Sequence, residues 1–136
     1  MRVGLKYNGR ELNLNVRNCN WFKKFIGLMF SRREKARALL LFDFKKPRRI
    51  GIHSFFCPRF LAVWLDKKNN IIEKRIVHSF NPLILPKRKF SRLVEIPINE
   101  KYDKMIKDLL ADEFPSVVRN IKNQRFLGFY KTPTMK

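Results

Sequence analysis

The sequence lacks most of the features that mark a membrane, secreted or familiar catalytic protein. None of its uninterrupted apolar runs approaches the roughly 20 residues that a membrane-spanning helix needs. The chain turns polar soon after Met1, before the apolar core of a signal peptide could form. Its five glycines are scattered singly, so there is no glycine-rich phosphate loop, and no GxSxG, HExxH or paired-carboxylate spacing is present. We therefore expect a cytoplasmic protein that does not enter a membrane. Enzymatic activity stays open, with the motifs arguing against it.

Cysteine is also scarce. Cys19 and Cys57 lie far apart with no CxxC spacing. A disulfide framework would need more cysteines, so reduced, buried thiols are expected. A zinc site made of these two thiols with His53 and His78 is the alternative, since zinc favours four nitrogen and sulfur ligands. None of the four shows the close pairing of a zinc finger. We predict no metal and no cofactor.

Acidic residues are the third shortage. Against 31 Lys and Arg the chain has 11 Asp and Glu, which gives a net charge of +20. A bias towards AT-rich codons would favour Glu as much as Lys, yet only six of the acids are Glu, and fourteen of the bases are Arg. A surface this positive attracts polyanions. The alternative is a solvated basic surface with no dedicated ligand.

What is present predicts an α+β protein of one-domain size. Alternating apolar residues on either side of Asn8-Gly9 predict a hairpin over residues 2–17. Helical spacing predicts a short helix near the N-terminus, residues 20–29, and an amphipathic helix in the C-terminal part, residues 100–113. Strands are expected at 38–44, 50–56, 60–65, 71–77 and 93–96, with a charged turn at 45–49 and an irregular loop at 78–92.

Five segments in register resemble the uncharacterised protein family 0127, which contains domain of unknown function 192. They are Phe25-Ile26-Gly27-Leu28-Met29-Phe30, Leu39-Leu40-Leu41-Phe42-Asp43-Phe44, Ile50-Gly51-Ile52-His53-Ser54-Phe55-Phe56, Val63-Trp64-Leu65-Asp66 and Leu93-Val94-Glu95-Ile96-Pro97. The resemblance implies a compact, β-rich, barrel-like domain over about residues 1–98 and carries no established activity. Leu61 stands where many members have an acidic residue, so chemistry that needs that carboxylate is in doubt. Residues 99–136 fall outside the pattern, and we expect them to form a C-terminal helix and a basic aromatic tail packed on the domain.

Basic residues gather in four clusters on predicted turns and linkers, where their side chains could reach phosphates. The clusters are Arg32, Arg33, Lys35 and Arg37; Lys45, Lys46, Arg48 and Arg49; Lys67 and Lys68; and Lys87, Arg88, Lys89 and Arg92. In the tail, Arg125 lies beside Phe126, and such aromatic residues could stack on bases or insert into a partner protein. These patterns favour a monomer that binds RNA or a ribonucleoprotein. The alternative is a β-barrel domain that binds a small molecule or a protein.

Three residues are weak catalytic candidates: His53, Cys57 and Asp66. Each has a structural interpretation that we prefer. Asp66 begins a turn whose backbone its side chain can bond, His53 is a hydrogen-bonded strand residue, and Cys57 is a core thiol. Glu95 follows apolar alternation on a strand, so we expect it to face solvent or an arginine.

Overall fold

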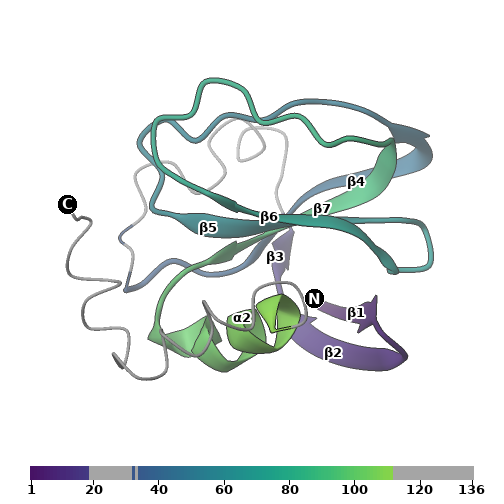
Figure 1. Cartoon of the computed structure of the whole chain (residues 1–136), viewed down its shortest axis with the longest axis horizontal. Helices are drawn as coiled ribbons and strands as arrows, with labels where there is room; N and C mark the ends of the chain where they lie inside the picture. Colours follow the sequence, from purple (N-terminus) through teal and green to yellow (C-terminus); the bar gives the residue numbers. More distant parts are fainter. Residues whose placement is uncertain (19–31, 33, 112–136) are drawn as a thin grey trace. The chain divides into compact units, whose positions relative to one another are not determined.

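The computed structural model describes residues 1–18, 32 and 34–111. Residues Met1–Tyr102 form one compact unit, and a second unit begins at Asp103. The first unit holds a two-stranded sheet, β1-β2, and a five-stranded sheet of order β3-β4-β7-β5-β6 (Figure 1). Within the described part of the chain the larger sheet is open, with β3 and β6 at its edges, so it does not close into a barrel.

The N-terminal hairpin is confirmed. β1 (Arg2–Tyr7) pairs antiparallel with β2 (Arg10–Asn15). Asn8 and Gly9 both have positive φ angles, of 52° and 74°, as a type I′ turn requires. A two-residue strand, β3 (Arg17–Asn18), then runs parallel to the start of the next strand.

The strand β4 (Leu39–Arg48) is longer than predicted. The turn expected at 45–49 is wrong, because the chain bulges there instead of turning. Between the pairs Asp43–Arg92 and Arg48–Phe90, β4 advances by five residues while its partner advances by two. Pro47 lies inside this bulge, where its missing N–H group breaks no ladder hydrogen bond.

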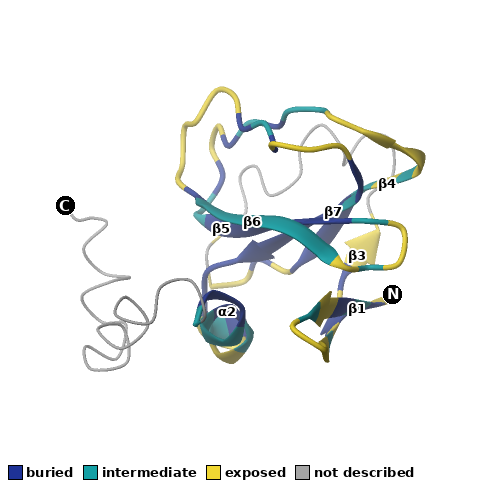
Figure 2. Cartoon of the chain, turned by 45° about the vertical axis from the view of Figure 1, so that its right-hand side comes forward, coloured by how far each residue is buried: buried dark blue, intermediate teal, exposed yellow. Residues whose placement is uncertain are grey.

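The hairpin of β5 (Phe60–Leu65) and β6 (Ile71–Val77) is confirmed. Every residue of β5 is buried, which explains its continuous apolar run, because both faces of an inner strand are covered. The strand predicted at 93–96 extends in both directions to become β7 (Phe90–Pro97), which lies between β4 and β5. Figure 2 shows β5 and β7 as the buried centre of the sheet.

Residues 49–59 and 78–89 together cover one face of the sheet, and we call them the cover. The strand predicted at 50–56 is wrong, since its only ladder contact is an isolated bridge between Ile52 and Ile84. The irregular loop predicted from 78 is confirmed as far as residue 89. Beneath the cover lies an apolar cluster that includes Ile52, Ile84 and Trp64. The hairpin β1-β2 lies on the other side of the sheet (Figure 1), joined to it by the hydrogen bond from Lys6 N to Asn69 O.

The helix predicted at 20–29 lies outside the described residues, as do Cys19, Arg33 and Arg125. The C-terminal helix is present as a short 3-10 turn, η1 (Glu100–Tyr102), and α2 (Asp103–Leu110). The mixed, mainly β class is therefore confirmed. No helix among the described residues is long and apolar enough to cross a membrane.

Ser54 holds the two halves of the cover together. Its buried hydroxyl donates to His78 O at 2.6 Å and accepts from Asn81 N at 2.8 Å. Its backbone N–H donates to Asn81 O, and its carbonyl accepts from Phe80 N. The two halves are thus tied by side-chain and main-chain bonds at one residue.

Replacing Ser54 with alanine should lower the free energy of unfolding by about 2 kcal/mol, because the part-buried hydrogen bonds to His78 O and from Asn81 N are both lost. Urea unfolding measures this change. Ser79→Ala is the matched control: the exposed Ser79 makes one such bond, from Oγ to Cys57 O, and should cost less than about 1 kcal/mol. Equal losses in the two variants would contradict the role given to Ser54.

Candidate nucleic-acid interface

Three of the four basic clusters meet at one end of the five-stranded sheet. The antiparallel register places the end of β4 and the end of β5 beside the start of β7, through the pairs Arg48–Phe90 and Leu65–Arg92. The β5–β6 turn with Lys67 and Lys68 lies at the same end. Sequence reasoning found the clusters, but only the strand order brings them together.

A groove of about 400 Å³ lies where the three segments meet, and we call it the basic groove. Lys67, Lys68 and Lys89 line it and are exposed. Ser91 lines it too, although only 1% of this residue is exposed, and its buried Oγ has no hydrogen-bond partner among the described residues. Three ammonium groups around one hollow suit a phosphate group. The other lining residues are Pro47, Asp66, Asn70, Ile72 and Phe90.

Asp66 is the one acid in the groove, and its oxygens are occupied. Oδ1 accepts from the backbone N–H groups of Lys68 at 2.8 Å and Asn70 at 2.9 Å, and Oδ2 accepts from Asn70 Nδ2 at 3.1 Å. Partial burial acts to raise the pKa of this carboxyl, but the bonds from Asn70 and Lys68 and the charge of Lys68 outweigh it and hold the pKa below its ordinary value. The predicted turn role of Asp66 is confirmed.

Replacing Asp66 with alanine should cost about 1 to 2 kcal/mol of stability, since two backbone N–H groups of the turn lose their acceptor. Because the folded-state pKa is lowered, this stabilisation is present above the ordinary pKa of 3.8 and is lost as the pH falls through the folded-state value. Thermal unfolding at neutral and acidic pH checks both points. Asp66→Asn retains an acceptor oxygen and should lose less. A destabilisation of Asp66→Ala that is equally large in strong acid would contradict this account.

Several of the predicted phosphate contacts serve the fold instead. Arg92 is half-buried and ties the β5–β6 turn to β4, since its NH1 donates to Asn69 Oδ1 at 2.8 Å and its Nε to Asp43 Oδ1 at 3.1 Å. Arg49 Nε donates to Pro86 O at 2.7 Å. The exposed cations that flank the groove segments are Lys45, Lys46, Arg48, Lys87 and Arg88. Arg32 is exposed but precedes the opposite end of β4.

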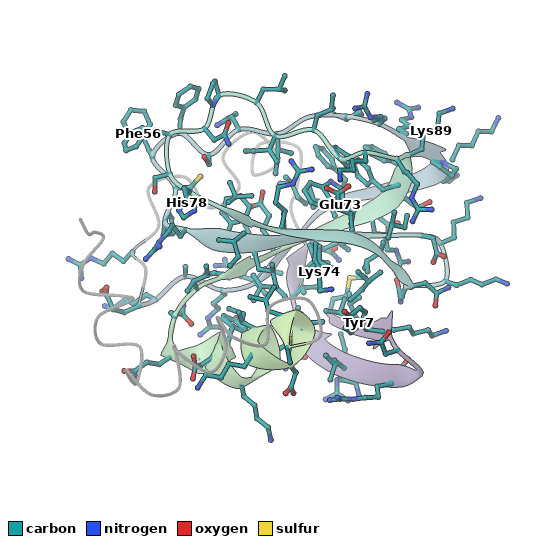
Figure 3. All side chains as sticks on the ribbon, in the orientation of Figure 1. Tyr7, Phe56, Glu73, Lys74, His78 and Lys89 are labelled. Atoms are coloured by element: carbon teal, nitrogen blue, oxygen red, sulfur yellow. The ribbon has the colours of Figure 1, made fainter. Side chains whose placement is uncertain are left out.

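A second hollow adjoins the first at Asn70, which lines both. It measures about 340 Å³ and lies at the turn of the N-terminal hairpin, beside Lys6 and Tyr7. Lys74 Nζ donates to the Tyr7 hydroxyl at 2.7 Å and lies 4.0 Å from the centre of the ring. Lys6 and Arg10 extend the basic lining across the β5–β6 turn. In Figure 3, Tyr7, Lys74 and Lys89 lie towards this end of the sheet, away from Phe56 and His78.

The three weak catalytic candidates are not brought together. Cys57 precedes β5 and Asp66 follows it, so the six residues of that strand separate them by roughly 20 Å. His53 Nδ1 accepts from Phe55 N at 3.2 Å, and Cys57 is buried. The described residues contain no group of three or more His, Cys, Asp or Glu placed to hold a metal ion.

The prediction that Glu95 faces solvent or an arginine is wrong. Glu95 is only 3% exposed. It lies on β7, where it pairs with Leu39 of β4 on one side and with Ala62 of β5 on the other. Within residues 1–18, 32 and 34–111 its Oε1 has no hydrogen-bond partner, and burial raises the pKa of the carboxyl to about 8. Arg75 lies on the same face two strands away, roughly 10 Å distant, and bonds Glu73 and Leu85 O. Glu95 is therefore a buried acid, far from the basic groove.

Comparison with known proteins gives a fold but no family. No family of known proteins matches the chain, and no curated protein matches it. Its structure is similar to a crystal structure from Sinorhizobium meliloti, of a protein provisionally described as a transcription regulator. The two share 20% sequence identity with a TM-score of 0.57, over 71% of this chain and 77% of the other.

Proposed function

We propose that this protein binds RNA, alone or within a ribonucleoprotein, by holding the phosphate backbone in the basic groove. The observation that carries the proposal is the convergence of three basic segments at one hollow, which Lys67, Lys68 and Lys89 line and which the segment 45–49 borders through Pro47. Basic clusters spread over all faces of the molecule would instead indicate a solvated basic surface without a dedicated ligand. Lys67, Lys68 and Lys89 line the groove and are exposed, so they would balance the charge of a phosphate held there.

We propose further that the protein acts as a monomer in the cytoplasm. We also propose that residues 1–98 belong to uncharacterised protein family 0127. In support, three of the quoted segments fall on β4, on the end of β5 and on β7, and a fourth falls in the cover. A barrel-like arrangement is proposed as well, in which the N-terminal hairpin curves over the face of the sheet opposite the cover; the isolated bridge between Lys6 and Asn70 supports it.

Fluorescence anisotropy with labelled single-stranded RNA, duplex RNA and duplex DNA across a salt series tests the function. Each phosphate contact releases counterions, so three lysine contacts should give a slope of about −2 in log K against log salt for a single strand. Binding that persists near physiological salt and prefers RNA supports the proposal. Binding that disappears at moderate salt without preference would reduce the charge to nonspecific attraction and reject it. A ligand-binding domain would instead show little salt dependence.

A further inference from the structure

An apolar patch lies on the cover, at the far end from the basic groove. Four side chains form it, Phe55, Phe56, Phe80 and Leu83, and they are between 38% and 64% exposed. The Phe56 and Phe80 rings meet edge to face, with their centres 5.6 Å apart. Large side chains left in water side by side mark an interaction surface more often than chance.

The backbone that carries two of these rings is strained. Phe56 and Phe80 both have left-handed backbone conformations, with φ of 58° and 62°, which bulky residues seldom adopt. Such strain persists only where the surroundings enforce it, and it gathers at functional sites. At Phe80 it is Ser54 that enforces this conformation, since its carbonyl accepts from Phe80 N at 3.0 Å and its Oγ accepts from Asn81 N. The backbone that carries the Phe80 ring is therefore fixed before any ligand arrives.

We propose that the apolar patch stacks the unpaired bases of the RNA strand whose phosphates lie in the basic groove; the inference rests on the function proposed above. Phenylalanine rings stack on any base, so they add affinity for single strands without reading sequence. A duplex, whose bases already stack on each other, would gain nothing from them. The patch would thus decide between single-stranded and double-stranded RNA.

The cover provides a path between the two sites. From Leu83 to Lys89 the chain advances six residues, which span at most about 20 Å. At about 3.4 Å per stacked nucleotide this length corresponds to about six nucleotides, within the range of about 4 to 16 that single-strand-binding domains occupy. Arg49, Lys87 and Arg88 are exposed along this path. Figure 3 shows Phe56 and Lys89 at its opposite ends.

The distribution of charge favours RNA over an anionic membrane as the occupant. A membrane-docking tip needs its cations around the apolar side chains, in the plane of the headgroups. Beside Phe80 and Leu83 the chain has Ser79, Asn81 and Pro82, which carry no charge. The exposed cations of residues 83–89 lie towards the groove end, where the phosphates of the bound strand would lie.

The test replaces both Phe56 and Phe80 with leucine in one variant and with tyrosine in another, in the full chain. Leucine retains the apolar surface and removes the aromatic face, whereas tyrosine retains both. With a labelled oligouridine of about 12 nucleotides, the leucine variant should bind at least about fivefold more weakly, the typical effect of losing a stacking ring. The tyrosine variant should bind like the wild type. Neither variant should change affinity for an RNA duplex of equal length, and thermal unfolding confirms that both are folded.

Each remaining outcome overturns the inference in a recognisable way. If wild-type protein binds oligouridine through the groove and the leucine variant binds equally well, the patch has no part in RNA binding and the proposed function stands. If duplex affinity falls as much as single-strand affinity, the rings do not stack on bases. A third variant replaces Phe56 and Phe80 with alanine. If the wild type binds vesicles of phosphatidylglycerol and phosphatidylcholine, and this variant loses that binding but retains its RNA affinity, the patch binds a membrane. No RNA binding by the wild type at all would reject the function and the inference together.

Discussion

Replacing Glu95 with glutamine should remove most of the loss of stability that the wild-type protein shows between about pH 5 and pH 8. The reason is the apolar surroundings of this carboxyl on β7, where burial raises its pKa from 4.5 to about 8. In the unfolded chain the group releases its proton near the ordinary value, while in the folded protein it retains the proton until the higher one. Between the two values the unfolded state binds fewer protons, so the free energy of unfolding falls as the pH rises.

The size of the effect follows from the width of that window. At about 1.4 kcal/mol for each unit of pKa shift, the wild type should lose roughly 3 to 5 kcal/mol from pH 5 to pH 8. That is a large part of the roughly 5 to 15 kcal/mol that holds a typical domain together. Glutamine cannot ionise, so the variant should be the more stable protein at pH 8 and differ little at pH 5.

Urea unfolding at a series of pH values measures this profile. Glu11→Gln is the matched control, because Glu11 is exposed on β2 and the change removes one carboxyl without altering the core. The control should retain the wild-type slope. If Glu95→Gln retains it as well, the pH dependence arises elsewhere and the raised pKa is refuted.

Reversing the three groove lysines should lower RNA affinity by roughly 100-fold near physiological salt, since three phosphate contacts become repulsive. The variant is Lys67→Glu with Lys68→Glu and Lys89→Glu. Its slope of log K against log salt should flatten by about 0.7 for each lost contact on a single strand. All three side chains are exposed, so the fold should survive.

The control for charge alone is the triple variant Arg2→Glu, Arg17→Glu and Lys101→Glu. These residues are exposed and none lines the groove. Each triple variant changes three charges by two units, so both proteins fall from +20 to +14. A control that loses as much affinity as the groove variant would mean that the net positive charge of the whole protein attracts RNA, with no defined site.

Local signals in the sequence were enough for the hairpins and for β5. Asn8-Gly9 determines its turn through backbone conformation, and Asp66 through side-chain bonds to the next residues. The bulge of β4 and the cover could not be predicted in this way. They depend on pairings such as Ile52 with Ile84, whose partners lie far apart along the chain and leave no periodic pattern.

The site shows the same division. The basic clusters are visible as runs of Lys and Arg, whereas their meeting depends on the order of the strands. Ser91 carries no signal in the sequence, because its burial and its lack of a partner exist only in the folded sheet. The prediction for Glu95 is wrong because alternation along a strand predicts one solvent-exposed face. An inner strand such as β7 is covered on both faces.

The position of β7 also sets the order of events as the chain is made. This strand lies between β4 and β5, yet it is the last strand of the described chain. During synthesis the hairpin of β5 and β6 can form as soon as it emerges. β4 has only the two-residue strand β3 beside it until its antiparallel partner emerges, some fifty residues further on. Until residues 90–97 leave the ribosome, the inner edge of β5 has no partner, and an unpaired apolar edge invites pairing with other chains. The nascent protein is therefore most vulnerable to aggregation just before β7 is inserted between β4 and β5, when a chaperone at the tunnel exit would have most effect.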